Sequence, residues 1–348
     1  MQKIKIGVLG PAEIAIRKTI PALIKCSDFE FVGVAIAKEE ERILVCDTRT
    51  NKQQETTNIS IEKAKEITKK FGGKIYLGYE TLLKSKEIDA IYIALPPKLH
   101  HFWGKKALEN NLHIFMEKPF TTSLKETEEL VNLAKEKNLA ISENFAFIYH
   151  PQIEKIQEII NNKQIGEIEL IRSNFGFPLR SSNDFRYKKE LGGGALLDCG
   201  CYTLKMAELL LGNIKIESSL LFKQPDYEVD IYGAITATND KNKIAQLSFS
   251  MNQQYKCELE IIGTKGYIKT DRIFTAPEDY IVRINVIVGT ETQTIDVPPA
   301  NQFLSSLLDF KNMIIDNKKK ISSYENILKQ SILVEKCLSG EQKWANFQ

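Results

Sequence analysis

The first 143 residues alternate between short β-branched runs and amphipathic helical patterns, and this alternation restricts the fold more than any other feature of the chain. Residues 3–9 and 31–37 have the composition of strands, and Ser60 opens a helical pattern that ends at Gly72. The alternation continues with strands at 89–95 and 113–116 and a helix at 123–138. Such a pattern predicts a doubly wound α/β domain of Rossmann type over residues 1–143, with a parallel sheet between two layers of helices.

Residues 144–348 have a different rhythm, in which strand-like runs follow one another after a helix at 152–161. The runs lie at 167–177, 215–223, 229–237, 244–251, 257–262, 267–270, 281–288 and 292–297. Short polar turns between several of them are typical of antiparallel pairs. Two helical stretches at 302–317 and 324–338 close the chain. This part is therefore predicted to be an α+β domain with a large, mostly antiparallel open sheet, for substrate binding and oligomerisation.

Composition excludes several classes of function. The chain has 348 residues, of which 43% are hydrophobic and 26% charged, and its net charge is +2. This balance provides no strong field that would attract nucleic acid or an acidic membrane, and we expect neither as a partner. No signal peptide or membrane span is recognisable at the sequence level. The six cysteines are scattered, so we expect reduced thiols in a cytoplasmic protein.

A glycine turn follows the first strand, where Gly10, Ala12 and Ala15 occupy the three small-residue places of a dinucleotide fingerprint. The first place makes a tight turn, the second lets the backbone approach the pyrophosphate, and the third packs the helix on the strand. Ala12 departs from the pattern, because its methyl group holds the backbone away from the phosphates. A plain strand–turn–helix is the alternative, but the position at the start of an alternating α/β half favours a dinucleotide site.

Lys38 stands near the end of the second strand, where the residue type distinguishes the two nicotinamide dinucleotides. An acidic residue there binds the ribose of NAD, and a basic residue accommodates the 2′-phosphate of NADP. Because Lys38 precedes Glu39 and Glu40, the sequence favours NADP(H), while a shift of one residue would favour NAD(H). A lysine in a solvated loop is the other interpretation.

The segment 41–59 is longer than a strand–helix connection needs, and we expect a solvated surface insertion. Its cations Arg42, Arg49 and Lys52 are alternative contacts for the adenine or 2′-phosphate end of the cofactor.

Three local patterns carry a resemblance to a known family. Residues 95–100, Leu-Pro-Pro-Lys-Leu-His, are similar to a Thr-Pro-Asn-x-x-His turn with two replacements. Glu117-Lys118-Pro119 matches a Glu-Lys-Pro signature at a strand end. Residues 192–202 resemble a Gly-Gly-Gly-x-x-x-Asp-x-Gly-x-His segment, with Tyr202 in place of the histidine. In this order and spacing the chain resembles, over essentially its whole length, the family of glucose–fructose oxidoreductases and inositol dehydrogenases (Gfo/Idh/MocA).

The resemblance implies hydride chemistry at Lys118 and Tyr202. Lys118 follows a parallel strand at the sheet edge where such folds bind ligands, and it can stabilise an oxyanion and lower the pKa of a nearby phenol. In the branches that carry tyrosine, this residue donates the proton, so Tyr202 takes that role by resemblance. Asp198 would hold a substrate hydroxyl or orient the lysine. Taken singly, each residue also has an ordinary role, as a strand-end cation, a packed aromatic or a helix cap.

The resemblance also implies which residues hold the cofactor. They are Gly10, Ala12, Glu13, Ile14, Lys38, Leu95, Pro96, His100, Glu117, Lys118, Asn144 and Arg186. For His100, packing or helix capping is an equally good interpretation. In the family the bond before Pro119 is cis, which would aim Lys118 into the cleft.

A finer resemblance points to the branch with dTDP-sugar 3-ketoreductases, parts of which dihydrodiol and xylose dehydrogenases share. It rests on residues 143–147 and 184–194. Arg186 is expected near the phosphates of the cofactor or substrate, with an interface ion pair as the alternative. The loop 178–189 also holds Arg180, Lys188 and Lys189, which suit a sugar diphosphate or simply a solvated loop.

The leading interpretation is an NADP(H)-dependent reductase of a keto-sugar carried on a nucleotide. An NADP-dependent dehydrogenase of free aldoses or cyclic diols is the first alternative, and a catalytically inactive dinucleotide-binding regulator is the second. We expect no metal, because Cys199 and Cys201 have no histidine in their segment. The expected partners are a small sugar or nucleotide-sugar and, by resemblance, further copies of the chain in a homodimer or homotetramer.

Overall fold

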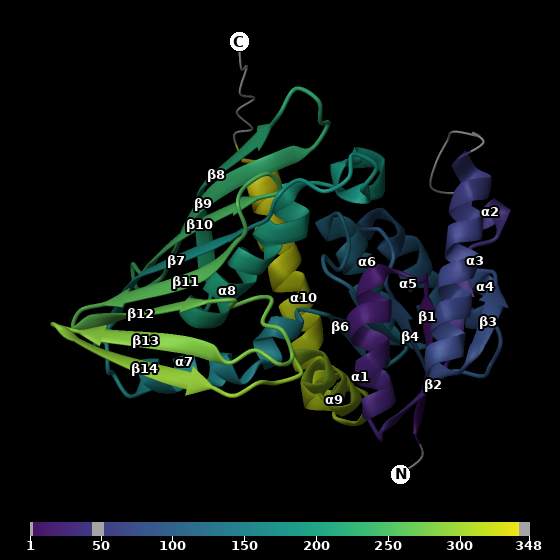
Figure 1. Cartoon of the computed structure of the whole chain (residues 1–348), viewed down its shortest axis with the longest axis horizontal. Coiled ribbons are helices and arrows are strands. Elements are labelled where there is room, and N and C mark those ends of the chain that lie inside the picture. The colour runs from purple at the N-terminus through teal and green to yellow at the C-terminus, as the bar shows by residue number, and fades with distance from the viewer. Residues whose placement is uncertain (1–2, 44–51, 341–348) are drawn as a thin grey trace. The chain divides into compact units, whose positions relative to one another are not determined.

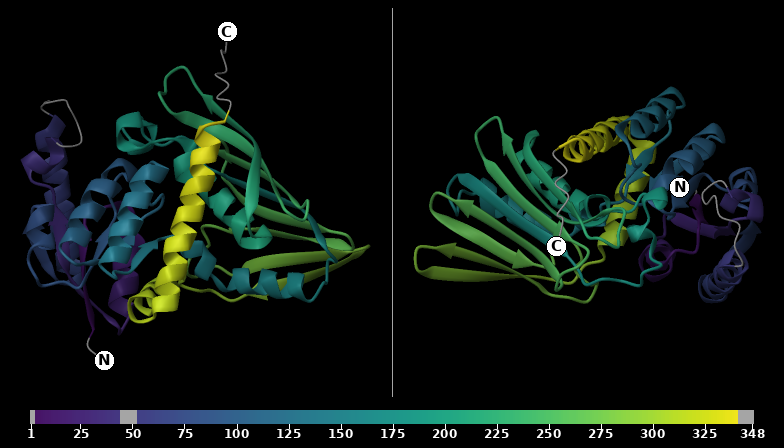
Figure 2. Two further views of the ribbon diagram at one scale, coloured as in Figure 1. Left: turned by 180° about the vertical axis from the view of Figure 1, so that it is seen from behind. Right: turned by 90° about the horizontal axis from the view of Figure 1, so that it is seen from above.

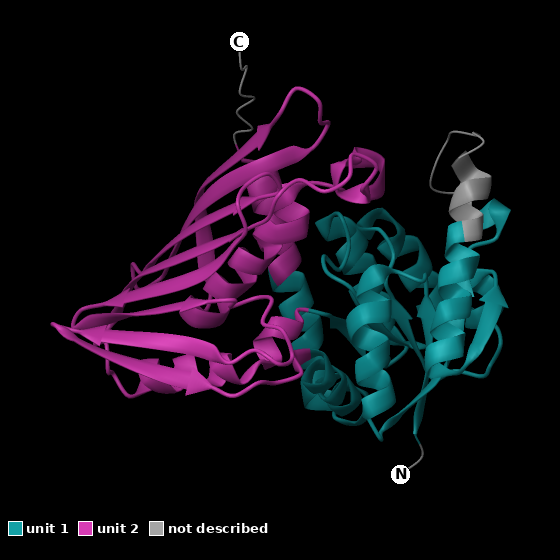
Figure 3. Ribbon diagram, in the orientation of Figure 1, with its two compact units in different colours: residues 1–144, 303–329 teal, residues 145–302, 330–348 magenta. Residues whose placement is uncertain are grey.

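The computed structural model of the chain describes residues 3–43 and 52–340, and its contacts define two compact units (Figure 3). Unit 1 comprises residues 1–144 and 303–329, and unit 2 comprises residues 145–302 and 330–348. The sequence places its division after residue 143. The structure differs by adding 303–329 to the first unit, because apolar side chains of that segment, such as Leu307 and Phe310, join the N-terminal core.

Unit 1 is built on a six-stranded parallel sheet in the order β3-β2-β1-β4-β5-β6 (Figure 1). The strands are β1 (Ile4–Leu9), β2 (Phe29–Ile36), β3 (Lys74–Leu77), β4 (Ala90–Ile93), β5 (His113–Met116) and β6 (Ile141–Glu143). The strand order reverses between β1 and β4, and ligands of such sheets bind in the crevice at this switch point. The predicted Rossmann-type sheet is confirmed.

Helices bury both faces of this sheet. They are α1 (Ile20–Lys25), α3 (Lys52–Phe71), α4 (Tyr79–Leu83), α5 (His100–Glu109), α6 (Leu124–Glu136) and α9 (Gln302–Ile315), with the first part of α10 (Asn317–Leu338). The short helix α2 (Glu39–Ile43) follows β2. Neighbouring residues of β1 enter different cores, since Val8 belongs to the core that contains Phe310 and Leu9 to the core that contains Trp103. Burial on both faces is what holds a parallel sheet together.

Unit 2 is built on an eight-stranded sheet in the order β14-β13-β12-β11-β7-β10-β9-β8 (Figures 1 and 2). The strands are β7 (Ile168–Gly176), β8 (Ile214–Lys223), β9 (Asp230–Asn239), β10 (Ile244–Ser250), β11 (Lys256–Gly263), β12 (Gly266–Asp271), β13 (Val282–Val288) and β14 (Glu291–Val297). Among the described strands of this sheet, only β7 and β10 pair in parallel, so the predicted mostly antiparallel sheet is confirmed. Helices α7 (Pro151–Asn161) and α8 (Cys201–Leu211) pack against it.

Two helix starts differ from the sequence prediction. The prediction of a start at Ser60 is wrong, because α3 begins at Lys52, and α10 begins at Asn317 rather than at Tyr324. In both cases the added residues are mostly polar and give no hydrophobic period. The expected insertion 41–59 is therefore largely helical at its two ends. Arg49 and Cys46 lie outside the described residues, as do the side chains of Arg42 and Lys52.

Within the described part of the chain, no helix is both long and apolar enough to span a bilayer.

Candidate active site

The predicted dinucleotide turn has the geometry that its glycine requires. Gly10 follows β1 with φ +85°, and a Cβ on it would lie 2.7 Å from Cδ2 of the buried Leu95. The backbone can therefore pass this point only without a side chain. Ala12 is half-buried, whereas Glu13 and Ile14 are exposed at the start of the following helix. Backbone amides at such a helix start can bind a pyrophosphate, so the turn fits a dinucleotide.

Lys38 lies just beyond β2 and is exposed. Its aliphatic stem runs across Gly78, where an added Cβ would come within 2.7 Å of Cε of Lys38. Glu39 and Glu40 are also exposed, in the first turn of α2, but Glu41 is only 8% exposed. The end of β2 is thus followed by one exposed lysine whose aliphatic side chain lies against Gly78.

Glu117, Lys118 and Pro119 follow β5 directly, at the carboxyl end of the sheet. The bond between Lys118 and Pro119 is cis, as the resemblance implied, and Lys118 is half-buried. Glu117 accepts hydrogen bonds at Oε1 from the hydroxyl of Tyr92 (2.6 Å) and from Nδ2 of Asn144 (2.8 Å). Burial raises the pKa of Glu117, although these hydrogen bonds and the charge of Lys118 oppose the rise.

The bonds at Glu117 belong to a longer polar chain inside unit 1. Thr19 Oγ1 donates to the hydroxyl of Tyr92 (3.0 Å), and Ser306 Oγ donates to Oδ1 of Asn144 (2.9 Å). Residues from the helix after β1, from β4, from the ends of β5 and β6 and from α9 are thereby linked. Asn144 is 2% exposed and uses both ends of its amide in this chain. Its predicted contact with the cofactor stays a prediction, and its observed role is to hold Glu117.

His100 connects the loops that follow β4 and β5. Its ring nitrogens each lie 2.8 Å from a backbone carbonyl oxygen, Nδ1 from that of Pro119 and Nε2 from that of Leu95. The side chain is fully buried. Burial lowers the pKa of His100, and the carbonyl contacts only partly offset this. His100 therefore fixes the backbone of the loops that follow β4 and β5, next to Lys118.

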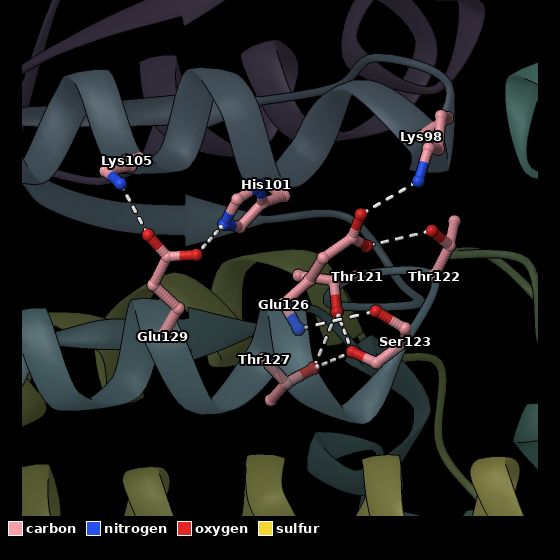
Figure 4. Close-up of polar contacts among 9 residues, drawn as sticks. All are labelled: Lys98, His101, Lys105, Thr121, Thr122, Ser123, Glu126, Thr127 and Glu129. Atoms are coloured by element: carbon pink, nitrogen blue, oxygen red, sulfur yellow. Dashed lines mark hydrogen bonds and ion pairs between the residues drawn. The ribbon is translucent and has the colours of Figure 1, made fainter.

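An array of polar contacts between α5 and α6 holds the other end of the Lys118 loop (Figure 4). Lys98 pairs with Glu126 at 2.8 Å, and Glu129 pairs with both His101 and Lys105. Below them, the hydroxyls of Thr121 and Thr127 lie 2.6 Å apart, and Ser123 caps α6 at the amide of Glu126. The loop from β5 to α6 is thus anchored at both ends.

In unit 2, Tyr202 lies in the first turn of α8 with its ring in an aromatic cluster. Its ring centroid is 5.4 Å from that of Phe145, 5.7 Å from Phe147, 5.2 Å from Phe175 and 5.5 Å from Phe274. Such contacts fix the plane of a phenol. Because the residue is only half-buried, the cluster orients the ring without enclosing it.

Asp198 and Arg186 form an ion pair in unit 2. Nε of Arg186 donates to Oδ2 of Asp198 at 2.8 Å, and its Nη1 donates to both carboxylate oxygens of Asp184. Burial disfavours the charged guanidinium, but the two carboxylates together raise the pKa of Arg186. The structure therefore brings these two predicted site residues together. Arg180 of the same loop is exposed and stacks on Phe177.

A residue that the motifs did not indicate holds the segment with Asp198 and Tyr202. Asp230 accepts a hydrogen bond from the backbone amide of Leu196 (2.7 Å), at the start of the helical segment. Gly194 has φ +128°, and a Cβ there would lie 2.4 Å from Oδ1 of Asp230. Burial raises the pKa of Asp230 from 3.8 to about 6. Sequence alone gives no signal for this contact, because Asp230 lies on the next strand but one.

The two cysteines next to Asp198 are packed into the helix. The thiol of Cys199 donates to the carbonyl of Ala195 and that of Cys201 to the carbonyl of Leu197. Over residues 3–43 and 52–340, the structure contains no cluster of three His, Cys, Asp or Glu side chains that could hold a metal ion.

The predicted site residues thus form two groups. Gly10, Lys38, His100, Glu117 and Lys118 belong to unit 1, together with Ala12, Glu13, Ile14, Leu95, Pro96 and Asn144, and Arg186, Asp198 and Tyr202 belong to unit 2. Contacts within each group are described above. The pairing of Lys118 with Tyr202 joins different units and stays a prediction.

Two family models match the chain. Residues 27–145 match an oxidoreductase family with a NAD-binding Rossmann fold, and residues 153–269 match the GFO/IDH/MocA C-terminal domain. The two matched segments fall mainly in units 1 and 2 respectively.

Similar proteins cover nearly the whole chain. A dTDP-3,4-didehydro-2,6-dideoxy-alpha-D-glucose 3-reductase of Actinomadura kijaniata is 30% identical over 97% of this chain and 95% of its own length. A crystal structure of a 3-ketoreductase from that organism, in complex with NADP and TDP-benzene, matches with a TM-score of 0.89 at 30% identity, over 99% of both chains. A trans-1,2-dihydrobenzene-1,2-diol dehydrogenase of Xenopus laevis is 31% identical over 68% of this chain and 71% of its own.

The family resemblance carried by the three motifs is therefore confirmed, and so is the assignment as an enzyme. The chain belongs to the GFO/IDH/MocA family of oxidoreductases.

Proposed function

We propose that the protein is an NADPH-dependent reductase of a keto-sugar carried on a nucleotide. The observation that carries this proposal is the full-length similarity, in sequence and fold, to 3-ketoreductases of dTDP-linked deoxysugars. Retention of Lys118, Asp198 and Tyr202 in ordered surroundings supports it, because a regulator without activity would not need them.

The cofactor site is proposed along the carboxyl ends of β1, β2, β4 and β5. The turn at Gly10, with Ala12, Glu13 and Ile14, would bind the pyrophosphate through backbone amides. Lys38 would bind the 2′-phosphate of NADP. NAD lacks this phosphate and would therefore bind without that contact. Leu95, Pro96, His100 and Glu117 form or support the part of the site nearest to Lys118.

Bound NADPH supplies the hydride, and this chain's residues handle the proton and the charge. Tyr202 donates its phenolic proton to the carbonyl oxygen, and Lys118 stabilises the negative charge that develops there. The ketone gains hydride at carbon and a proton at oxygen and becomes a secondary alcohol, and solvent returns a proton to the phenolate. Asp198 holds a substrate hydroxyl or orients Lys118, and its carboxylate is paired with Arg186.

The diphosphate of the substrate is proposed to bind at the loop 178–189. Arg180 and Lys189 are exposed there and Lys188 is half-buried, whereas Arg186 is already engaged by two carboxylates. Arg186 would therefore contact a phosphate only through guanidinium N–H groups that do not donate to Asp184 or Asp198.

A panel of dTDP- and UDP-linked keto-sugars and of free aldoses and cyclic diols tests the proposal, with nicotinamide absorbance as the readout. We expect NADPH oxidation with a dTDP-keto-sugar. The diol dehydrogenase relative makes the oxidative reaction the second candidate. Turnover confined to unphosphorylated aldoses or diols would reject the nucleotide-sugar proposal in favour of that candidate.

We further propose that the protein is a cytoplasmic homodimer or homotetramer. In unit 2 the helices α7 and α8 contact the sheet, and α10 adds Val334 and Cys337 to the same core. Exposed apolar side chains such as Ile244 and Tyr267 lie on the strands of this sheet. Light scattering on the purified protein tests this. A monomer at micromolar concentration would contradict it.

A further inference from the structure

The carboxylate of Glu41 is bound by three backbone amides. Its Oε2 accepts hydrogen bonds from the amides of Lys38 (2.8 Å) and Tyr79 (2.9 Å), and its Oε1 accepts one from Glu80 (2.9 Å). The residue is 8% exposed, whereas Glu39 and Glu40 on the same helix are exposed. A single side chain thus connects the end of β2 to the start of α4.

The start of α4 needs such a side chain from elsewhere. The residue at its N-cap is Gly78, which has no side chain, so Glu41 supplies the acceptor for the first amides of the helix. The amide of Gly78 donates to the carbonyl of Ile36 at 2.8 Å, which closes a ring of hydrogen bonds around the end of β2.

The stem of Lys38 lies on this ring. It crosses Gly78 so closely that a Cβ there would meet Cε at 2.7 Å and Cδ at 3.1 Å. Glu41 therefore holds both the backbone from which Lys38 starts and the surface on which its stem rests. The ammonium group also acts on Glu80, whose pKa is lowered mainly by Lys84 and in smaller part by Lys38.

We propose that Glu41 is a positioning residue that sets the preference for NADPH over NADH by fixing Lys38 for the 2′-phosphate. This inference rests on the proposed function of Lys38. It assigns a role to a glutamate in a stretch where acidic residues would ordinarily suggest NAD.

The sign of the effect distinguishes positioning from simple electrostatics. A carboxylate near a phosphate repels it, so removal of a negative charge by itself would strengthen the binding of NADPH. Removal of a positioning carboxylate weakens it, because Lys38 then has to be ordered when the cofactor binds. The two effects therefore predict opposite changes.

The test compares Glu41→Gln with Glu40→Gln, which removes the same charge from an exposed place on the same helix. Dissociation constants for NADPH and NADH are measured by fluorescence titration of the full-length protein. We expect Glu41→Gln to weaken NADPH about five- to tenfold, with NADH nearly unchanged, as for the loss of one charge-assisted contact. We expect Glu40→Gln to bind NADPH as tightly as the wild type or more tightly.

Coupling to Lys38 completes the test. In a Lys38→Met background the Glu41→Gln change should no longer alter the NADPH/NADH ratio, because the group that Glu41 positions is gone. If Glu41→Gln fails to fold, Glu41→Asp keeps the charge with a shorter reach, and it should show the same selective loss to a smaller extent.

The outcomes separate this inference from the proposed function. Suppose that the wild type prefers NADPH, that Lys38→Met abolishes this preference and that both Glu41 variants retain it. That outcome would overturn only the role of Glu41. Equal wild-type affinities for the two cofactors, or no effect of Lys38→Met, would overturn the role of Lys38 and this inference with it.

Discussion

At the scale of single residues, the side chains assigned to the chemistry depend on neighbours that no motif contains. The ring of Tyr202 is fixed by four phenylalanines, and Lys118 follows a glutamate whose carboxylate is held by Tyr92 and Asn144. The local motifs indicated which residues to propose for the chemistry. They could not predict these supports, because contacts between distant segments leave no fixed spacing in a sequence.

Substitution of the two proposed catalytic residues should separate chemistry from binding. Lys118→Met and Tyr202→Phe are each expected to lower kcat about 10²- to 10⁴-fold, the range for loss of a positioned proton donor or charge. Titration with NADPH should give nearly wild-type affinity for Tyr202→Phe. Wild-type turnover in both variants would show that the site is elsewhere.

The hydroxyl of Tyr92 should contribute measurably to stability. Tyr92→Phe removes the donor to Glu117 and the acceptor for Thr19 and leaves a buried carboxylate oxygen with less compensation. We expect the free energy of unfolding in urea to fall by about 1–3 kcal/mol. Tyr267→Phe, at a residue that is 37% exposed, is the matched control and should change stability little. If both variants lowered the free energy of unfolding equally, the stabilising role of the hydrogen bonds that link Thr19, Tyr92 and Glu117 would be contradicted.

At the scale of elements, helix α9 follows the strands of unit 2 in the sequence but packs in the core of unit 1. The sequence predicted this helix but grouped it with the second half, because nothing in an amphipathic pattern says which sheet its apolar face will meet. In the structure the ring of Phe310 lies 5.2 Å from Phe115 and 6.4 Å from Phe29, both in unit 1. The short strands β3 and β6 were also missed, since four or three residues carry too little pattern.

Truncation on α9 tests its place in the core. Phe310→Ala removes a fully buried ring and should lower the free energy of unfolding by about 3–5 kcal/mol. Leu308→Ala on the same helix, where the side chain is 39% exposed, should cost far less. Thermal unfolding followed by circular dichroism would measure both. A small effect of Phe310→Ala would place α9 outside the core of unit 1.

The burial of the Asp230 carboxylate beside the segment 194–200 predicts a dependence of stability on pH, because burial raises the pKa of Asp230 although the bond from the Leu196 amide opposes the rise. The pKa of Asp230 is about 6 in the folded protein against an ordinary 3.8, so the folded state binds the proton more tightly than the unfolded state. The associated stability is fully present below the ordinary pKa and is lost as the pH rises through about 6. Asp230→Asn should remove this dependence in urea titrations between about pH 4 and pH 7. Asp240→Asn, at an exposed turn, should leave it intact.

At the scale of the whole molecule, the sequence predicted both sheets and the family, because alternating periods and spaced motifs are properties of contiguous segments. Lys38 was identified but not the carboxylate that holds it, since Glu41 acts on amides that lie 38 and 39 residues further along the chain. The ion pair of Arg186 with Asp198 was not predicted, because the resemblance suggested phosphates as the partner of Arg186, with an interface ion pair as the alternative. Local sequence patterns predict helices and strands, whereas contacts between polar groups that are distant in the sequence can be identified only once the fold is known.

The inclusion of residues 303–329 in unit 1 has a consequence for how the protein is made. A ribosome releases the chain from its N-terminus, and domains generally fold as they emerge. Unit 1 lacks Ser306, Phe310 and the rest of α9 until residues 145–301 have been synthesised, so all strands of the unit 2 sheet emerge before the Rossmann core is complete. During translation residues 1–144 would then expose apolar surface while residues 145–301 are being synthesised, which makes them the segment on which a chaperone would act.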